Sequence, residues 1–271
     1  MPELPEVETT KRGISPHIEG QSISEVIIRQ ARLRWPIPAD LAQTLVGRKV
    51  LSVTRRAKYL LLSFEHGTLL IHLGMSGNLR VLTEAFPAEK HDHFDLVLAN
   101  STRLRYRDPR RFGACLWQPI ENGPHPLLLQ LGPEPLSDQF NADYLLLANS
   151  NRKIAIKLAI MDNHTVVGVG NIYAAESLFR AKINPQRAAN SLSLQEAAQL
   201  VIAIKATLND AITAGGSTLK DYVDSDGKAG YFQLSAFVYA RAGMPCRICS
   251  GEIKQIRQGQ RSTFYCPQCQ I

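Results

Sequence analysis

The sequence has no long hydrophobic run, no internal repeat and no low-complexity segment. No stretch of its 271 residues approaches the ~18 consecutive apolar residues that a membrane-spanning helix needs. The first residues include Glu3, Glu6 and Glu8, where a secretory signal peptide would be basic and then apolar. These absences argue against a membrane or secreted protein. We therefore expect a cytoplasmic protein with no membrane partner.

Cysteine is scarce outside one segment. Cys115 stands alone, and we expect it to be a buried apolar side chain. The other four lie near the end of the chain as Cys246-x-x-Cys249 and Cys266-x-x-Cys269. Each such turn can present two thiolates to one ion, which is typical of a tetrahedral zinc site. Two disulfides are the alternative, but a cytoplasmic location disfavours them. The spacing predicts one structural zinc ion.

Positive charge is concentrated in two places. The formal net charge is +7. Residues 241–271 hold five basic side chains against Glu252, and residues 103–111 hold five arginines against Asp108. Either cluster alone could be a solvated face. Two separate clusters, one beside a cysteine quartet, indicate a nucleic-acid footprint.

The hydrophobic pattern changes along the chain. With 45% hydrophobic and 20% charged residues, a chain of this length can bury two cores. Helical spacing predicts a helix over 6–18, and proline and glycine between Pro119 and Pro135 indicate a linker. A capping box of Ser193 and Glu196 starts a later helix that ends at 215–216. Between the first helix and the linker, short β-rich runs predict a β-sandwich at 23–29, 50–55, 59–64, 68–73, 94–99 and 102–106.

The amino terminus is a candidate nucleophile. Removal of Met1 would leave Pro2 with a secondary amine, whose pKa near ~8 keeps a useful fraction unprotonated at neutral pH. Such an amine forms an iminium directly on a sugar aldehyde carbon. Glu3 follows and could move the protons. Met-Pro-Glu also opens many ordinary chains, so this motif alone does not decide.

Three further features could contact a polyanion. The turn 168–171 precedes a helical segment and could aim backbone N–H groups at a phosphate, although a plain helix start has the same pattern. Lys58 lies between two predicted strands and could meet a phosphate or stay solvated. Met75, Arg110 and Phe112 lie on predicted loops, where they could enter a base stack or pack in a core.

Taken together, these pieces match a known pattern. The chain closely resembles the bacterial formamidopyrimidine-DNA glycosylases, and the match runs from the first residue to the last few. It is carried, in order, by Pro2-Glu3-Leu4-Pro5-Glu6-Val7-Glu8-Thr9, Lys58, His72-Leu73-Gly74-Met75-Ser76-Gly77, Asp108-Pro109-Arg110-Arg111-Phe112-Gly113, Gly168-Val169-Gly170-Asn171-Ile172-Tyr173 and the cysteine quartet.

The resemblance implies a multidomain α and β fold. It places an N-terminal β-sandwich domain with flanking helices at 1–132, a helix–two-turns–helix domain at 133–237 and a zinc-finger hairpin at 238–271. It also implies a monomer that binds double-stranded DNA, with oxidised-purine or abasic sites, in the cleft between domains. The expected activity is base excision followed by strand cleavage through β,δ-elimination.

The resemblance also assigns roles to residues. Pro2 would attack C1′, Glu3 would protonate the sugar ring oxygen, and Lys58 would hold a phosphate. Met75, Arg110 and Phe112 would fill the space left by a flipped nucleotide, with Arg110 facing the orphaned cytosine. Further DNA contacts would come from His91, Asn171, Lys220 and Arg261, and a loop over the flipped base from Ser217, Thr218, Tyr222, Lys228 and Tyr231. In that loop, Ala229 stands where the family pattern has proline, which predicts a looser loop.

Two other readings remain at this point. Endonuclease VIII-type glycosylases share the proline amine, the domains and the zinc finger but prefer oxidised pyrimidines. The segment 4–7 and the Arg110/Phe112 arrangement resemble the purine branch. A zinc-ribbon DNA-binding protein without chemistry would explain the quartet and the charge, but it leaves Pro2, Glu3 and Lys58 unexplained.

Overall fold

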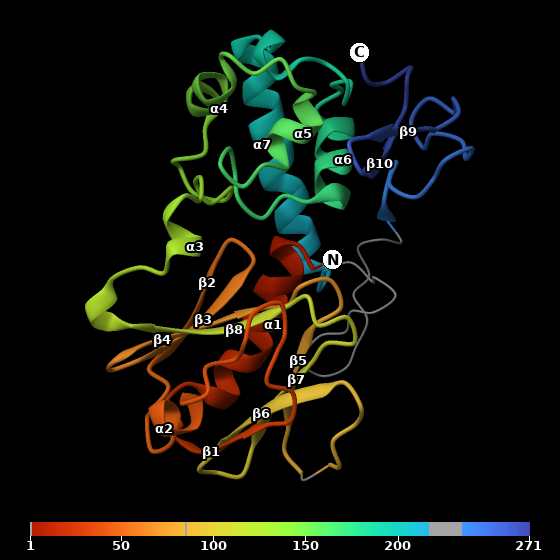
Figure 1. Ribbon diagram of the computed structural model, residues 1–271. Coiled ribbons are helices and arrows are strands. Elements are labelled where there is room, and N and C mark those ends of the chain that lie inside the picture. The colour runs from red at the N-terminus through yellow and green to blue at the C-terminus, as the bar shows by residue number, and fades with distance from the viewer. Residues whose placement is uncertain (1, 85, 217–234) are drawn as a thin grey trace. The chain divides into compact units, whose positions relative to one another are not determined.

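The structure is a computed structural model that describes residues 2–84, 86–216 and 235–271 (Figure 1). The described residues form two compact units, one of 2–129 with 214–216 and one of 130–213 with 235–271. The predicted boundaries of three domains, at 132 and 237, stay predictions. The elements are α1 Leu4–Ile18, β1 Ile23–Ile28, α2 Leu41–Leu45, β2 Ser52–Arg56, β3 Tyr59–Phe64, β4 Gly67–His72, β5 Asn78–Leu82, β6 Asp92–Leu98, β7 Arg103–Arg107, β8 Ala114–Pro119, η1 Ile120–Asn122, α3 Pro126–Leu129, α4 Ala142–Asn149, α5 Ile156–Ile160, α6 Asn171–Arg180, η2 Ala189–Ser191, α7 Leu194–Thr213, β9 Lys254–Gln258 and β10 Arg261–Tyr265.

The first helix begins two residues earlier than the sequence pattern predicts. Pro5 lies in the first turn of α1, where its missing N–H would have no helical partner in any case. The carboxylate of Glu6 accepts a hydrogen bond from the Glu3 backbone N–H at 2.8 Å, which closes this turn. The helix therefore starts immediately after Pro2 and Glu3.

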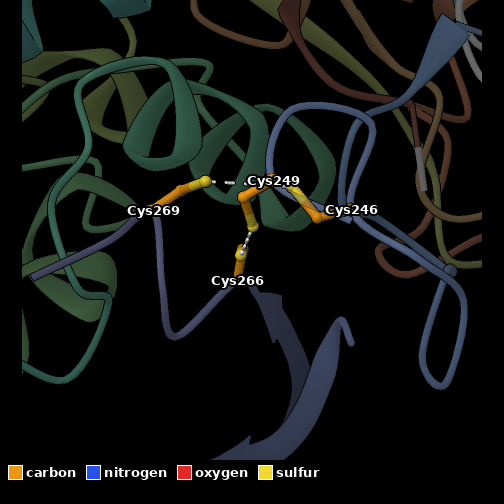
Figure 2. A group of neighbouring side chains, drawn as sticks. All are labelled: Cys246, Cys249, Cys266 and Cys269. Carbon is orange, nitrogen blue, oxygen red and sulfur yellow. Dashed lines mark hydrogen bonds between the residues drawn. The ribbon is translucent and has the colours of Figure 1, made fainter. Parts of the chain in front are cut away.

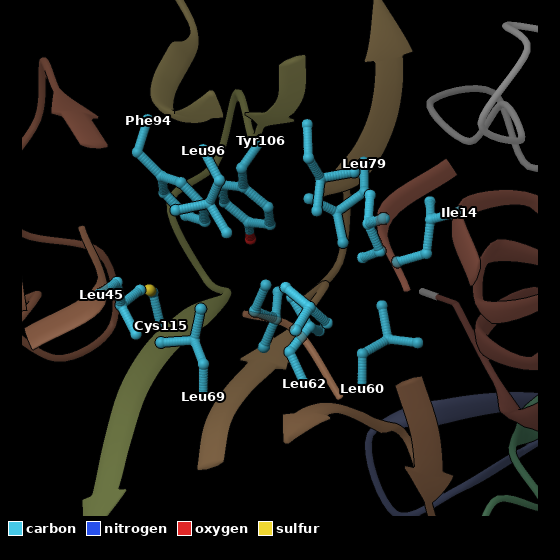
Figure 3. Close-up of a cluster of buried hydrophobic side chains, with 14 of the residues drawn as sticks. Ile14, Leu45, Leu60, Leu62, Leu69, Leu79, Phe94, Leu96, Tyr106 and Cys115 are labelled. Carbon is cyan, nitrogen blue, oxygen red and sulfur yellow. The ribbon is translucent and has the colours of Figure 1, made fainter. Parts of the chain in front are cut away.

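A β-sandwich forms the core of the first unit. Its two antiparallel sheets have the strand orders β1-β6-β7-β5 and β2-β3-β4-β8. Figure 3 shows side chains of both sheets meeting in one buried cluster, to which α1 adds Ile14 and α2 adds Leu45. The predicted sandwich is confirmed. Leu60, Leu62 and Leu69 come from one sheet, and Leu79, Phe94, Leu96 and Tyr106 from the other.

The sequence pattern does not predict two of the strands, β5 and β8. Both lie at the edges of their sheets. Edge strands tolerate charged side chains and proline because one side of the backbone needs no partner strand. Accordingly β5 contains Arg80, and β8 ends at Pro119. Their sequences therefore alternate less clearly than those of the inner strands.

Cys115 lies on β8 and is a core residue, as predicted. Its side chain is buried in the sandwich, and burial raises the pKa of its thiol to about 12. A thiol with such a pKa is almost wholly protonated at neutral pH. Cys115 is therefore not a nucleophile under these conditions.

The second unit is helical and ends in a β-hairpin. Helix α7 packs against α4 and α6, and α6 also packs against β10. The predicted capping box is present, because the Ser193 N–H donates to Glu196 at 2.8 Å and the Glu196 N–H donates to the Ser193 hydroxyl. Within the described ranges, no helix is both long enough and apolar enough to span a membrane.

Candidate active site and metal centre

The amino-terminal residues are held at the start of α1. Pro2 is buried and Glu3 is only 3% exposed. The N-terminal end of a helix carries a partial positive charge, which disfavours a further cation. A Pro2 amine formed here by removal of Met1 would lie at this end of α1, directly beside Glu3.

Lys58 lies in the two-residue turn between β2 and β3, and this turn is tied to α1. The Arg55 guanidinium donates to the Glu8 carboxylate at 3.0 Å and to the Ala57 carbonyl at 2.8 Å. Burial raises the pKa of Glu8, but hydrogen bonds from Lys11 and Arg55 outweigh it and keep that pKa below its usual value. An ionised Glu8 thus fastens the Lys58 turn to the helix that begins beside Pro2. Lys58 itself is largely buried.

Met75, Arg110 and Phe112 are not core residues. Met75 lies between β4 and β5 and is 38% exposed, while Phe112 lies between β7 and β8 and is 46% exposed. The Arg110 guanidinium lies 4.8 Å from the centroid of the Phe112 ring. Two exposed apolar side chains and one arginine on adjoining loops fit insertion into a base stack better than packing.

His72 ends β4 and is held neutral. Its Nδ1 accepts a hydrogen bond from the Gly74 N–H at 3.0 Å. Burial, with smaller contributions from the nearby positive charges of Lys58 and Arg34, lowers the pKa of His72 from 6.5 to about 4. Protonation would remove the acceptor that orients the start of the Met75 loop.

This pKa predicts a pH dependence of stability. Between pH 6.5 and 4 the unfolded chain binds a proton at His72 that the folded chain does not, so stability falls as pH falls through this window. We expect this group to account for a loss of about 2 to 3 kcal/mol between pH 7 and pH 4.5. Urea unfolding of the wild type and of His72→Gln at both pH values measures it. Equal pH dependence in the two proteins would contradict the assignment.

Four cysteines form a metal centre in the second unit (Figure 2). Their sulfur atoms all lie within 4.8 Å of one another, with 3.9 Å between Cys246 and Cys269 and 3.4 Å between Cys249 and Cys266. A tetrahedral zinc site with Zn–S bonds of about 2.3 Å has sulfurs about 3.8 Å apart. The separations exceed a disulfide bond of about 2.05 Å. The donor set fits one structural zinc ion.

A lysine that the sequence pattern does not single out joins Asn171 to the strand that begins with Arg261. Lys157 is buried on α5, and its Nζ donates to Asn171 Oδ1 at 2.6 Å and to Thr263 Oγ1 at 2.7 Å. The Asn171 amide also donates to the Ser262 carbonyl at 3.0 Å. The start of α6 is thereby fastened to β10, whose first residue is the exposed Arg261.

A second buried charge anchors the chain before the metal centre. The Glu176 carboxylate on α6 accepts hydrogen bonds of 2.8 to 3.0 Å from the backbone N–H groups of Phe237, Val238 and Tyr239. This carboxylate also lay outside the sequence prediction. A buried acid within a helical segment has no local pattern that marks its partner.

Other predicted contacts fall in different places. His91 is half-buried, and its carbonyl accepts a hydrogen bond from the Asp108 N–H. The remaining predicted residues lie outside the described part of the chain and stay predictions. These are Ser217, Thr218, Lys220, Tyr222, Lys228, Ala229 and Tyr231.

Comparison with known families covers most of the chain. Residues 1–115 match the formamidopyrimidine-DNA glycosylase N-terminal domain, 131–223 the H2TH domain of that glycosylase, and 243–271 the zinc finger found in FPG and IleRS. The chain belongs to the formamidopyrimidine-DNA glycosylase family. It is therefore a DNA glycosylase of DNA repair, with a zinc finger.

Full-length relatives agree with this assignment. The chain is 56% identical to the formamidopyrimidine-DNA glycosylase of Marinobacter nauticus and 57% identical to that of Neisseria meningitidis, each over 100% of both chains. It is also similar to the crystal structure of the MutM (Fpg) protein of Thermus thermophilus, at 40% identity and a TM-score of 0.87 over 99% of this chain and 98% of that one.

Solved complexes of the family contain damaged DNA. A Lactococcus lactis Fpg variant bound to DNA containing Fapy-dG matches with a TM-score of 0.92, and Lactococcus lactis Fpg bound to abasic-site DNA matches with 0.91. Both are 33% identical to this chain, and each match covers 99% of both chains. Members of the family thus bind DNA with a damaged or missing base.

Proposed function

We propose that this glycosylase removes oxidised purines, 8-oxoguanine and formamidopyrimidines, from double-stranded DNA and then cleaves the strand. The observation that carries the proposal is the arrangement around α1. Pro2 and Glu3 are buried at its N-terminal end, and the Lys58 turn is tied to it through Arg55 and Glu8. The relatives bound to Fapy-dG DNA and abasic-site DNA support the formamidopyrimidine lesion and the abasic site as substrates.

The proposed first stage is base excision. The neutral Pro2 nitrogen forms a bond to C1′ of the damaged nucleotide, and the bond from C1′ to the base breaks, so that the departing base takes the electron pair and the proton that the Pro2 amine loses. Glu3 gives a proton to the ring oxygen, so that the ring C1′–O4′ bond opens. The product is an iminium ion joining Pro2 to the opened sugar, with the Lys58 ammonium holding a neighbouring phosphate.

The second stage is strand cleavage. The iminium draws electrons from C1′ and acidifies the C2′ proton, which a base such as the Glu3 carboxylate can remove. Loss of this proton expels the 3′ phosphate by β-elimination. A second proton loss expels the 5′ phosphate by δ-elimination. Water then hydrolyses the remaining iminium and releases the free amine.

The nucleotide must leave the base stack before Pro2 can reach C1′. Flipping costs a few kcal/mol, and filling the vacancy offsets part of that cost. Met75 and Phe112 would occupy the vacancy, and Arg110 would donate hydrogen bonds to the cytosine left without its partner.

We also propose that the enzyme acts as a monomer in the bacterial cytoplasm. Sedimentation at assay concentrations tests the monomeric state.

Borohydride trapping tests the proposal. The purified protein is incubated with duplex DNA containing 8-oxoguanine opposite cytosine, reduced, and mapped by mass spectrometry. We expect a covalent adduct at Pro2 without Met1. Trapping only on duplexes with an oxidised pyrimidine would favour the preference of the endonuclease VIII-type family. Binding with no adduct on this duplex or on an abasic one would overturn the amine mechanism.

A further inference from the structure

Asp108 is a buried carboxylate for which the proposed chemistry has no role. It follows β7 and is fully buried. Its Oδ1 accepts hydrogen bonds from the Ser76 hydroxyl at 2.7 Å and from the Arg110 N–H at 3.2 Å. Its Oδ2 accepts from the Gly113 N–H at 2.9 Å and from the Tyr106 hydroxyl at 3.3 Å. Four donors thus converge on one side chain.

Three of these donors, from Ser76, Arg110 and Gly113, belong to the two loops that carry Met75, Arg110 and Phe112, and the fourth, Tyr106, lies on β7. Ser76 is the neighbour of Met75 in the loop between β4 and β5. The N–H groups of Arg110 and Gly113 bracket the exposed part of the loop between β7 and β8. One carboxylate therefore fixes both loops at once, across 32 positions of sequence between Ser76 and Asp108.

The two loops are also in direct backbone contact. Gly74 has φ +64°, and a Cβ there would overlap the backbone of Phe112 and Gly113. Arg111, between the two bracketing N–H groups, has the left-handed φ of 56°, which is strained for a residue with a side chain. A strained loop needs outside contacts to hold its conformation, and Asp108 accepts a hydrogen bond on each side of Arg111.

The backbone of Asp108 extends the same arrangement into the sandwich. The His93 ring lies 2.6 Å from the Asp108 carbonyl, and the Asp108 N–H donates to the His91 carbonyl at 3.1 Å. The Tyr106 hydroxyl has one hydrogen, which the Asp108 carboxylate at 3.3 Å and the His72 carbonyl at 3.2 Å share, and the Tyr106 ring stacks on Phe94 in the core. Figure 3 shows Tyr106 and Phe94 side by side among the buried side chains. Through these contacts, the strands of the sandwich hold the two loops in place.

We propose that Asp108 is a positioning residue that holds Met75, Arg110 and Phe112 in one fixed arrangement, so that they enter the space of the flipped nucleotide together. This inference rests on the proposed function. It adds that one carboxylate couples the wedge, formed by Met75 and Phe112, to Arg110, which reads the opposite base. Both the efficiency of flipping and the discrimination of the opposite base then depend on Asp108.

The test compares a substrate that needs the wedge with one that does not. Duplex DNA with 8-oxoguanine opposite cytosine requires flipping and leaves a vacancy. A single-stranded oligonucleotide with an abasic site has an accessible aldehyde and no vacancy. We expect Asp108→Asn to slow single-turnover excision from the duplex by about 10- to 100-fold, a range typical of misplaced groups. Cleavage of the single strand should stay within about twofold of the wild type, since Pro2 and Glu3 are unchanged.

Opposite-base discrimination is the second readout. The ratio of the excision rate opposite cytosine to the rate opposite adenine should fall in Asp108→Asn, because the side chain at position 108 no longer holds the Arg110 backbone in place. Ser76→Ala removes one of the four donors and should shift both readouts in the same direction by less. Ser76→Thr keeps the hydroxyl and should restore wild-type ratios. These milder variants keep the proposal testable if Asp108→Asn does not fold.

Asp95→Asn is the matched control. Asp95 is a fully buried carboxylate on β6 that accepts hydrogen bonds from Arg29 and Arg105, at a distance in sequence from both loops. The Asp95→Asn variant should have a lower melting temperature, but its duplex-to-single-strand ratio and its cytosine-to-adenine ratio should equal those of the wild type. If Asp108→Asn leaves the duplex-to-single-strand ratio unchanged, or lowers both rates equally with the fold intact, the positioning role is wrong. A wild-type protein that forms no Pro2 adduct on either substrate would instead overturn the proposed function and this inference with it.

Discussion

Replacement of Pro2 by glycine is expected to abolish strand cleavage while DNA binding survives. A glycine amine is primary and forms a neutral imine, which must gain a proton before it can draw electrons, whereas the proline amine gives a cationic iminium directly. Glycine also loses the rigid ring that orients the nitrogen at the start of α1. We expect single-turnover excision to fall by on the order of 10³-fold or more, the scale seen when a covalent nucleophile is lost.

Pro5→Gly is the matched control for this experiment. Pro5 lies in the same first turn of α1 but offers no terminal amine. The variant should be less stable, since glycine loses more conformational freedom on folding, yet it should retain trapping at Pro2. Fluorescence anisotropy on an uncleavable abasic analogue reports binding in each variant. A Pro2→Gly protein as active as the wild type would sink the amine mechanism.

Loss of the zinc centre is expected to weaken DNA binding strongly. The quartet closes the segment that contains β9 and β10, and Arg261 begins β10. Without the metal, four buried or half-buried thiols no longer share one ion, and the hairpin loses the bonds that order it. We expect Cys249→Ala to lower affinity for duplex DNA by about 10- to 100-fold near physiological salt, because ordered phosphate contacts are lost.

Salt dependence separates this effect from general unfolding. Each lost phosphate contact should reduce the slope of log affinity against log salt by about one. Cys249→Ala should therefore show a shallower slope of log affinity against log salt than the wild type. Fluorescence anisotropy from about 50 to about 300 mM salt measures this slope. Cys115→Ala, outside the quartet, should keep the slope. A zinc-free preparation with unchanged affinity and slope would contradict the role of the metal.

Much of the fold followed from local sequence patterns. The inner strands of the sandwich alternate or run apolar because both their neighbours are strands, and the helices α6 and α7 carry clear start signals at Gly170 and Ser193. The edge strands β5 and β8 were missed because Arg80 and Pro119 interrupt their apolar runs, which an edge allows, whereas β1 and β2, which are also edge strands, keep a clearer pattern. The helical spacing predicts a start of α1 at residue 6, two residues late, because it gives no signal for Leu4 and Pro5, although proline suits a first turn.

The sequence by itself determined the groups whose chemistry depends on neighbours along the chain. Pro2 and Glu3 are adjacent, and the zinc ligands come in two close pairs, so short spacing specifies both. Only the tertiary structure decided which buried charges hold these groups in place. Arg55 meets Glu8 across 47 positions, Ser76 meets Asp108 across 32, and Lys157 meets Thr263 across 106. A buried polar group requires a partner, but no local pattern says which distant residue supplies it, because chain folding alone brings the two together.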